Sequence, residues 1–144
     1  MDITQDRRTE VDRILGTASR WASGRRDVTA LGLAGSWARG AERMSSDVDL
    51  VVLTTSPESY IQSEDWLSDF GDPPVVRTQE WGGMLTERRV RLDSGLEIEF
   101  GFTRPAWSAV DPVDAGTRRV VSDGMRPLYD PVSSLAMLIA EIRG

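Results

Sequence analysis

Cysteine, histidine and lysine, three residue types that carry much of protein chemistry, are absent from this chain of 144 residues. Without cysteine there is no disulfide, no thiolate nucleophile and no cysteine-bound zinc. Without histidine the commonest general base is missing, so a catalytic base must be a carboxylate. Any metal site must then consist of oxygen ligands, which magnesium and manganese prefer.

Because lysine is absent, arginine supplies all 17 basic residues against 23 acidic ones, and the net charge is −6. Such an acidic chain does not attract nucleic acid in bulk. No apolar run approaches the length of a membrane span, and the N-terminus is charged, so we expect a cytoplasmic protein without a membrane partner. The length fits one domain over residues 1–144.

Hydrophobic periodicity predicts alternating helices and strands. Helices are expected over residues 5–23, 58–70 and 131–143, with a short one over 37–40. Strands are expected over residues 28–34, 48–53, 75–80, 84–92 and 96–102, with a turn at 93–95 before the last. Residues 105–125 show no clear pattern. The expected class is α/β (α+β), a mixed sheet with helices packed on it.

Two aspartates stand two positions apart at the start of an almost wholly apolar strand. Because strand side chains alternate, the carboxylates of Asp47 and Asp49 point the same way. Such close carboxylates repel each other, and a divalent cation removes the repulsion. Two metal ions about 3.5–4 Å apart, bridged by such a pair, can activate an attacking oxygen and stabilise a leaving one.

A third carboxylate from a neighbouring strand commonly completes such a site. Glu97 and Glu99 face one way on the strand over 96–102 and are the candidates, as metal ligands and, for Glu99, as the catalytic base. We prefer Glu99, while a solvated strand face is the alternative for both. The nearby Arg88, Arg89 and Arg91 are interpreted as solvated or ion-paired to these acids, with phosphate binding as the second interpretation.

A Gly-Ser turn precedes the aspartate pair by ten residues. Gly35 permits a tight turn and close backbone approach, and Ser36 brings a hydroxyl beside free N–H groups. These groups suit the oxygens of a triphosphate. Arg39, one turn later, can neutralise phosphate charge, and Arg43 is a weaker candidate. The alternative for Ser36 is a helix N-cap without further function.

With Gly35-Ser36, ten intervening residues and Asp47-x-Asp49, the chain resembles the DNA polymerase β-like nucleotidyltransferase superfamily, and most of all its minimal standalone members. The clear resemblance covers residues 28–102. It implies a mixed, strongly twisted sheet, magnesium or manganese as cofactor, and a nucleoside triphosphate, with ATP preferred, as donor. It also implies transfer of a nucleoside monophosphate to a hydroxyl acceptor with release of pyrophosphate.

Three function classes remain open for the acceptor. The enzyme could modify a small hydroxyl compound, or a protein or tRNA, or the chain could bind nucleotide without turnover. Minimal nucleotidyltransferases that resemble this chain act as antitoxins that adenylylate a HEPN toxin, which makes a HEPN-like partner one expectation. The complete acid and serine set argues against the third class, and the acidity argues against bulk tRNA binding.

Two apolar features are more simply structural. The stripe near the C-terminus is expected in the core and is wide enough for a homodimer or partner surface as well; its members are Leu135, Met137, Leu138, Ile139 and Ile142. The tryptophans are expected in the core or at its rim. Trp81-Gly82-Gly83 is the exception, because glycine beside an exposed aromatic ring suits a flat ligand.

Overall fold

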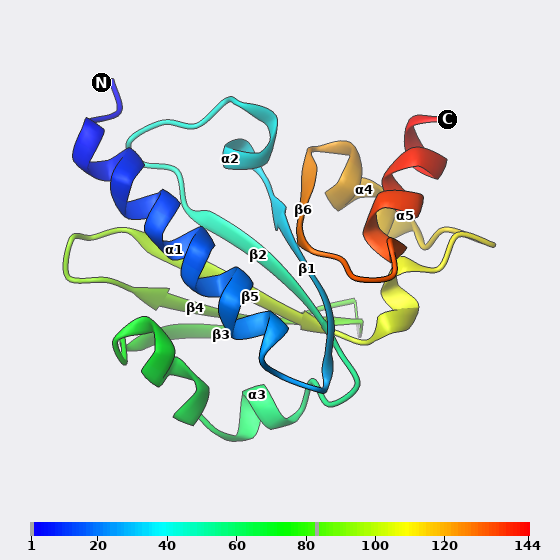
Figure 1. The fold of residues 1–144 in the computed structure, drawn as a ribbon, viewed down its shortest axis with the longest axis horizontal. Coiled ribbons are helices and arrows are strands. Elements are labelled where there is room, and N and C mark those ends of the chain that lie inside the picture. Colours follow the sequence, from blue (N-terminus) through cyan, green and yellow to red (C-terminus); the bar gives the residue numbers. More distant parts are fainter. Residues whose placement is uncertain (1, 83) are drawn as a thin grey trace.

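The computed structural model describes residues 2–82 and 84–144, which form a six-stranded sheet with helices on both faces (Figure 1). The strands are β1 (Val28–Ala34), β2 (Val48–Thr54), β3 (Val75–Trp81), β4 (Leu85–Arg91), β5 (Glu97–Thr103) and β6 (Met125–Tyr129). The helices are α1 (Gln5–Ser23), α2 (Ser36–Arg39), α3 (Ser59–Gln62), α4 (Ala115–Ser122) and α5 (Ser134–Arg143), with 3-10 helices η1 (Asp65–Phe70) and η2 (Pro105–Ser108). The expected α+β fold class is confirmed.

The sheet is mixed and has the order β3-β4-β5-β2-β1-β6. The central pair β2 and β5 runs parallel, and every other neighbouring pair is antiparallel. The register places Asp49 of β2 between Ala34 of β1 and Glu99 of β5. Two acids far apart in the sequence are therefore direct neighbours on adjacent strands.

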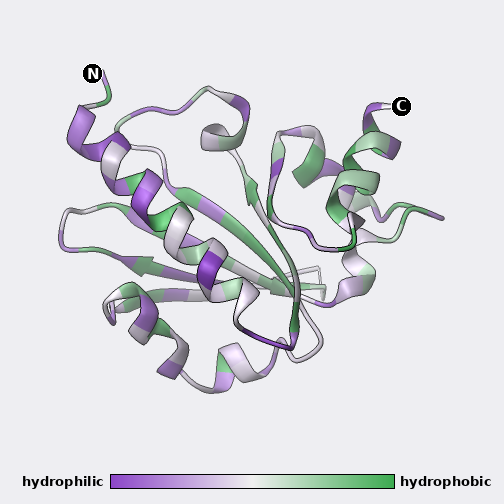
Figure 2. Cartoon of the chain, viewed as in Figure 1, coloured by the Kyte–Doolittle hydropathy of each residue, from purple (hydrophilic) through white to green (hydrophobic). Residues whose placement is uncertain are grey.

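Alternation along β2 divides the core into two layers. Val48, Leu50 and Val52 pack under α1 together with the aromatic side chains of β5 and η1. Val51 and Leu53 face the other way and pack with residues of α4 and α5. Figure 2 shows the apolar colour of the central strands and the mixed colour of α1, as expected for a surface helix with one buried face. The acids of β2 thus lie on the α4 side.

The predicted helix over 58–70 is wrong as one element, because the chain breaks between α3 and η1. Ser63 adopts an extended conformation, and its hydroxyl accepts a hydrogen bond from the backbone N–H of Asp65. The indole N–H of Trp66 and the guanidinium of Arg88 donate to the backbone carbonyl of Tyr60. These side-chain donors satisfy the backbone that a continuous helix would have paired.

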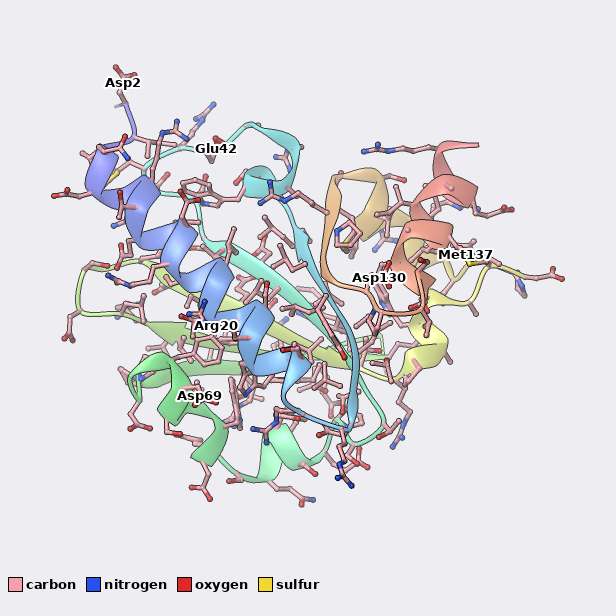
Figure 3. All side chains as sticks on the ribbon, in the orientation of Figure 1. Asp2, Arg20, Glu42, Asp69, Asp130 and Met137 are labelled. Carbon is pink, nitrogen blue, oxygen red and sulfur yellow. The ribbon has the colours of Figure 1, made fainter. Side chains whose placement is uncertain are left out.

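The last predicted helix begins three residues later than expected, and β6 was not predicted. The carboxylate of Asp130 accepts hydrogen bonds from the backbone N–H groups of Leu135 and Ala136. It lies beside the start of α5 and acts as its cap (Figure 3). β6 carries Pro127 and lies at the sheet edge, where proline is tolerated but obscures a strand pattern.

The apolar stripe of α5 is largely core, as predicted, because Leu135 and Leu138 are buried whereas Met137 is 61% exposed. The core prediction also holds for three tryptophans, while Trp81 is half exposed; the buried ones are Trp21, Trp66 and Trp107. Gly83, part of the proposed flat-ligand motif, lies outside the described residues. No helix in the described part of the chain is long and apolar enough to cross a membrane.

Candidate functional site

The two aspartates and the Gly-Ser turn open into one cavity of about 470 Å³ between the sheet and α4. Asp47 immediately precedes β2, and Asp49 is its second residue. β2 begins beside the end of β1, where the chain passes into α2, so the turn lies directly beside the acids. The predicted residues that line the cavity are Gly35, Ser36, Arg39, Asp47, Asp49 and Glu99.

A slightly larger cavity, of about 510 Å³, lies between α1 and the turn that joins β4 and β5. It contains none of the predicted site residues, and its acids and arginines form a mixed surface. Size alone therefore does not select the candidate site; we select the smaller cavity because the Gly35-Ser36 turn, Asp47 and Asp49 line it.

Asp49 is the most perturbed acid of the cavity. Burial, with smaller contributions from the carboxylates of Asp47 and Glu87, raises the pKa of Asp49 to about 6. Attraction to Arg89 and Arg39 opposes this rise without cancelling it. Within residues 2–82 and 84–144 no arginine forms an ion pair with Asp49. Its negative charge is consequently balanced only in part by the protein itself.

The other three acids share one arginine. A guanidinium nitrogen of Arg89 lies 2.8 Å from Asp47 and 2.7 Å from Glu97, and Arg89 also pairs with Glu99. Hydrogen bonds from Arg89 and Arg91 hold the pKa of Glu97 below its usual range. The predicted ion pairing of these arginines with the glutamates is confirmed. Arg88 points to the other face, where it contacts Tyr60 and Glu64.

The donor set fits hard divalent cations, because every candidate ligand offers carboxylate oxygen. As the side chains lie, no three acids of the described chain converge closely enough to hold a metal ion. The guanidinium of Arg89 instead provides the positive charge between Asp47, Glu97 and Glu99. Its place among three carboxylates shows that this position favours a cation.

The Gly-Ser turn has the form expected for anion binding. Gly35, with φ 74° and ψ −155°, precedes α2, and Ser36 is the first helical residue. No side chain caps this helix, so the N-cap interpretation of Ser36 is wrong and its hydroxyl remains on the cavity wall. Arg39 donates to the backbone carbonyl of Asp123, which holds it at the cavity rim. Arg43 lines a different surface pocket.

We expect Gly35→Ala to disturb the acid site directly. Its backbone conformation is accessible essentially to glycine alone, and an added Cβ would collide with the Asp49 carboxylate. The free energy of unfolding should fall by about 2–3 kcal/mol, measured by urea denaturation. Gly40→Ala is the control, because Gly40 has the same φ of 74° in the ordinary left-handed region, which costs alanine only about 1 kcal/mol, and has open space around it. Equal losses in both variants would contradict the collision.

Sequence reasoning missed residues on β3, β4 and α4 that contribute to the site. Glu87 is buried and raises the pKa of Asp49, while Arg77 lies 2.7 Å from Glu87 and 3.8 Å from Glu99. From α4 and its end, Val120 and Asp123 complete the cavity wall. The alternation of Glu87 and Arg89 along a predicted strand was a usable signal, because both must face the same way. Nothing in the sequence of α4 indicated its position.

Comparisons with known proteins identify the family of the chain. The family described as Streptomycin adenylyltransferase matches residues 7–93, which is more than half of the chain. No curated protein matches. Among solved structures, the chain is similar to the one described as "Structural Basis for the Activity of a Cytoplasmic RNA Terminal U-transferase".

That structural similarity has a TM-score of 0.53 at 20% identity and covers 71% of this chain and 31% of the other. At this identity it supports the fold, and this chain spans less than a third of that protein's length. The Gly35-Ser36 turn and the Asp47 and Asp49 pair lie within the residues that the family matches. The chain belongs to the streptomycin adenylyltransferase family, within the DNA polymerase β-like nucleotidyltransferase superfamily.

Proposed function

We propose that this protein transfers a nucleoside monophosphate, preferably AMP, from a nucleoside triphosphate to a hydroxyl acceptor in a reaction dependent on two divalent cations. The observation that carries the proposal is the only partly compensated carboxylate of Asp49, which lies beside the Gly35-Ser36 turn in a cavity shared with Asp47 and Glu99. Asp47, Asp49 and Glu99 would hold Mg²⁺ or Mn²⁺. A bound cation supplies charge neutralisation for the acids and for the phosphates.

The protein's own residues position the two substrates. Ser36 and the backbone after Gly35 would hold the β- and γ-phosphates, and Arg39 would offset their charge. The acceptor oxygen then forms a bond to the α-phosphorus while the bond to the β-phosphate oxygen breaks and pyrophosphate leaves. The acceptor proton passes to Glu99, since no histidine, cysteine or lysine is present to accept it.

The acceptor that the cavity suits best is a small, positively charged hydroxyl compound. Asp123 and Glu87 add negative charge to the acids already described, so the site attracts a cation. Streptomycin, named in the family description, has this chemistry and is the first acceptor to test. Incubation with ATP, Mg²⁺ and streptomycin should increase the acceptor mass by one nucleoside monophosphate. Unchanged mass with every triphosphate would contradict a streptomycin acceptor.

A protein acceptor, such as a HEPN-like partner, is the second candidate. It is favoured by large apolar side chains that remain exposed, above all Val132 at 73% and Met137 at 61%, because exposed apolar patches commonly mark partner surfaces. A mass increase on a co-purified protein, with none on small hydroxyl compounds, would support this candidate over the first.

Ser36→Ala tests the phosphate-binding role. Loss of one hydrogen bond to a charged group should weaken triphosphate binding by about 1–2 kcal/mol. Calorimetric titration with ATP and Mg²⁺ gives the affinity directly. Ser23→Ala, at the exposed end of α1, is the control and should bind like the unmodified protein. Equal affinities of the two variants for ATP would show that the triphosphate does not bind at this turn.

A further inference from the structure

Arg89 occupies the centre of the acid cluster. It belongs to β4, and the register places it directly opposite Glu99 of β5. Its guanidinium pairs with Glu99, Glu97 and Asp47, which come from two different strand regions. One side chain therefore holds three of the four acids that were expected to be cation ligands.

The charge balance around Arg89 is unequal. Glu97 has a second partner in Arg91, at 2.6 Å, and Glu99 has only a distant one in Arg77, at 3.8 Å. Within the described part of the chain Asp47 has no ion pair except that with Arg89. The Nε of Arg89 is buried without a hydrogen-bond partner. The acids thus satisfy only part of the hydrogen-bonding capacity of the guanidinium. Such a contact suits an arginine that a cation can replace.

A cation can replace Arg89 at the acids only if the arginine side chain moves away. A guanidinium stays charged at any physiological pH, so deprotonation cannot release it from the acids. A divalent cation that approaches Asp47 and Glu99 meets a fixed positive charge, which repels it and occupies the carboxylate oxygens.

We propose that Arg89 is an internal counter-ion that keeps the acids assembled in the metal-free protein and must swing away when a divalent cation binds. This positioning role rests on the cation site of the proposed function. It makes cation binding weaker than the acids alone would allow, and it stabilises the free protein by neutralising charges that otherwise repel each other.

Titration of the nucleotide-free protein with Mn²⁺, followed by calorimetry, tests this role. Arg89→Met keeps an unbranched apolar chain in place of the aliphatic part of arginine and removes the guanidinium with its charge and its hydrogen bonds. It should bind Mn²⁺ at least about tenfold more tightly than the unmodified protein, because competition and repulsion are both removed. Its melting temperature without metal should fall. A purely structural arginine would lower stability without any gain in affinity.

Arg91→Met is the matched control. The substitution removes the same charge two residues further along β4. Arg91 contacts Glu97 alone among the site acids. We expect a gain in Mn²⁺ affinity much smaller than that of Arg89→Met. Equal gains in the two variants would overturn the specific role of Arg89, since general electrostatics would then explain both. Unchanged or weaker binding by Arg89→Met would overturn it as well.

Two further measurements keep the proposal testable if Arg89→Met does not fold. In the unmodified protein, the Nε–H nuclear magnetic resonance signal of Arg89, assigned with Arg89→Lys, should shift as Mg²⁺ is added. A signal that does not respond while Mg²⁺ binds would overturn the proposal.

Asp49→Asn distinguishes failure of the cation site from failure of the role of Arg89. If it abolishes Mn²⁺ binding while Arg89→Met binds normally, the cation site stands and only the role of Arg89 falls; binding by neither the unmodified protein nor Arg89→Met overturns both.

Discussion

Asp49→Asn is expected to make the metal-free protein more stable and at the same time to abolish nucleotidyl transfer. Burial and the neighbouring acids raise the pKa of Asp49 to about 6, so its ionised form is disfavoured by folding. At pH 7 the carboxylate is nonetheless ionised in the folded and in the unfolded protein. Asparagine removes the charge at nearly the same volume, so the cost of ionisation in the folded state is lost.

The gain in the free energy of unfolding should be about 1–2 kcal/mol, or roughly 3–6 °C in melting temperature. The difference between the two proteins should shrink as the pH falls below about 6 and disappear below about pH 3, where the carboxyl is protonated in the folded and in the unfolded state. Asp47→Asn is the control, because Asp47 already has an ion pair with Arg89 at 2.8 Å. It should gain nothing or lose stability.

The functional loss should be large. Several kcal/mol of charge stabilisation depend on the cation site, so transfer should fall by about a hundredfold or more. Mg²⁺ with ATP should raise the melting temperature of the unmodified protein by mass action and leave that of Asp49→Asn unchanged. A variant that responds to Mg²⁺ and ATP like the unmodified protein would show that Asp49 does not belong to the site.

The elements α1 and β1 could be predicted because one signal, the spacing of their apolar residues, determines them. The helix over 5–23 and the strand over 28–34 match α1 and β1 to the residue, since a regular apolar pattern is bounded by Gly24 at one end and Gly35 at the other. The aspartate pair could also be recognised in the sequence, because two charges beside an apolar strand have few structural explanations.

The elements that were predicted wrongly or missed depend on tertiary contacts that no local pattern contains. The break after α3 depends on Trp66 and Arg88, which donate to carbonyls from outside that helix. β6 forms because β1 offers it a free edge, despite Pro127 within it. The third acid was ambiguous for a similar reason: Glu97 and Glu99 share a face, and only the register with Asp49 separates them.

The structure now gives different expectations for the two glutamates. Glu99 lines the cavity and lies beside Asp49 in the register of β2 and β5. Glu97 is absent from the cavity wall and is hydrogen-bonded by Arg89 and Arg91, which hold its pKa below its usual range. Glu99 pairs with Arg89 as well, so the cavity wall and the strand register, and not ion pairing, separate the two acids. We therefore expect Glu99 to be the base and Glu97 to position Arg89.

Glu99→Gln should lower the turnover number by at least about a hundredfold while ATP affinity stays nearly unchanged. Glutamine keeps the shape of the side chain and cannot accept the acceptor proton. If Glu99 acts only as a cation ligand, high Mg²⁺ should restore part of the activity. We expect no such rescue, measured as turnover at rising Mg²⁺ with ATP saturating.

Glu97→Gln is the matched variant, two residues away on the same strand face, and it should lower turnover only several-fold. The inactive variant identifies the base, because both changes remove one charge from the same cluster around Arg89. An inactive Glu97→Gln beside an active Glu99→Gln would place the base two residues earlier on β5, at the acid that shares Arg89 with Asp47. Full activity in both would leave Asp47 and Asp49 as the only acids of the reaction, and a water molecule or the acceptor itself would have to carry the proton away.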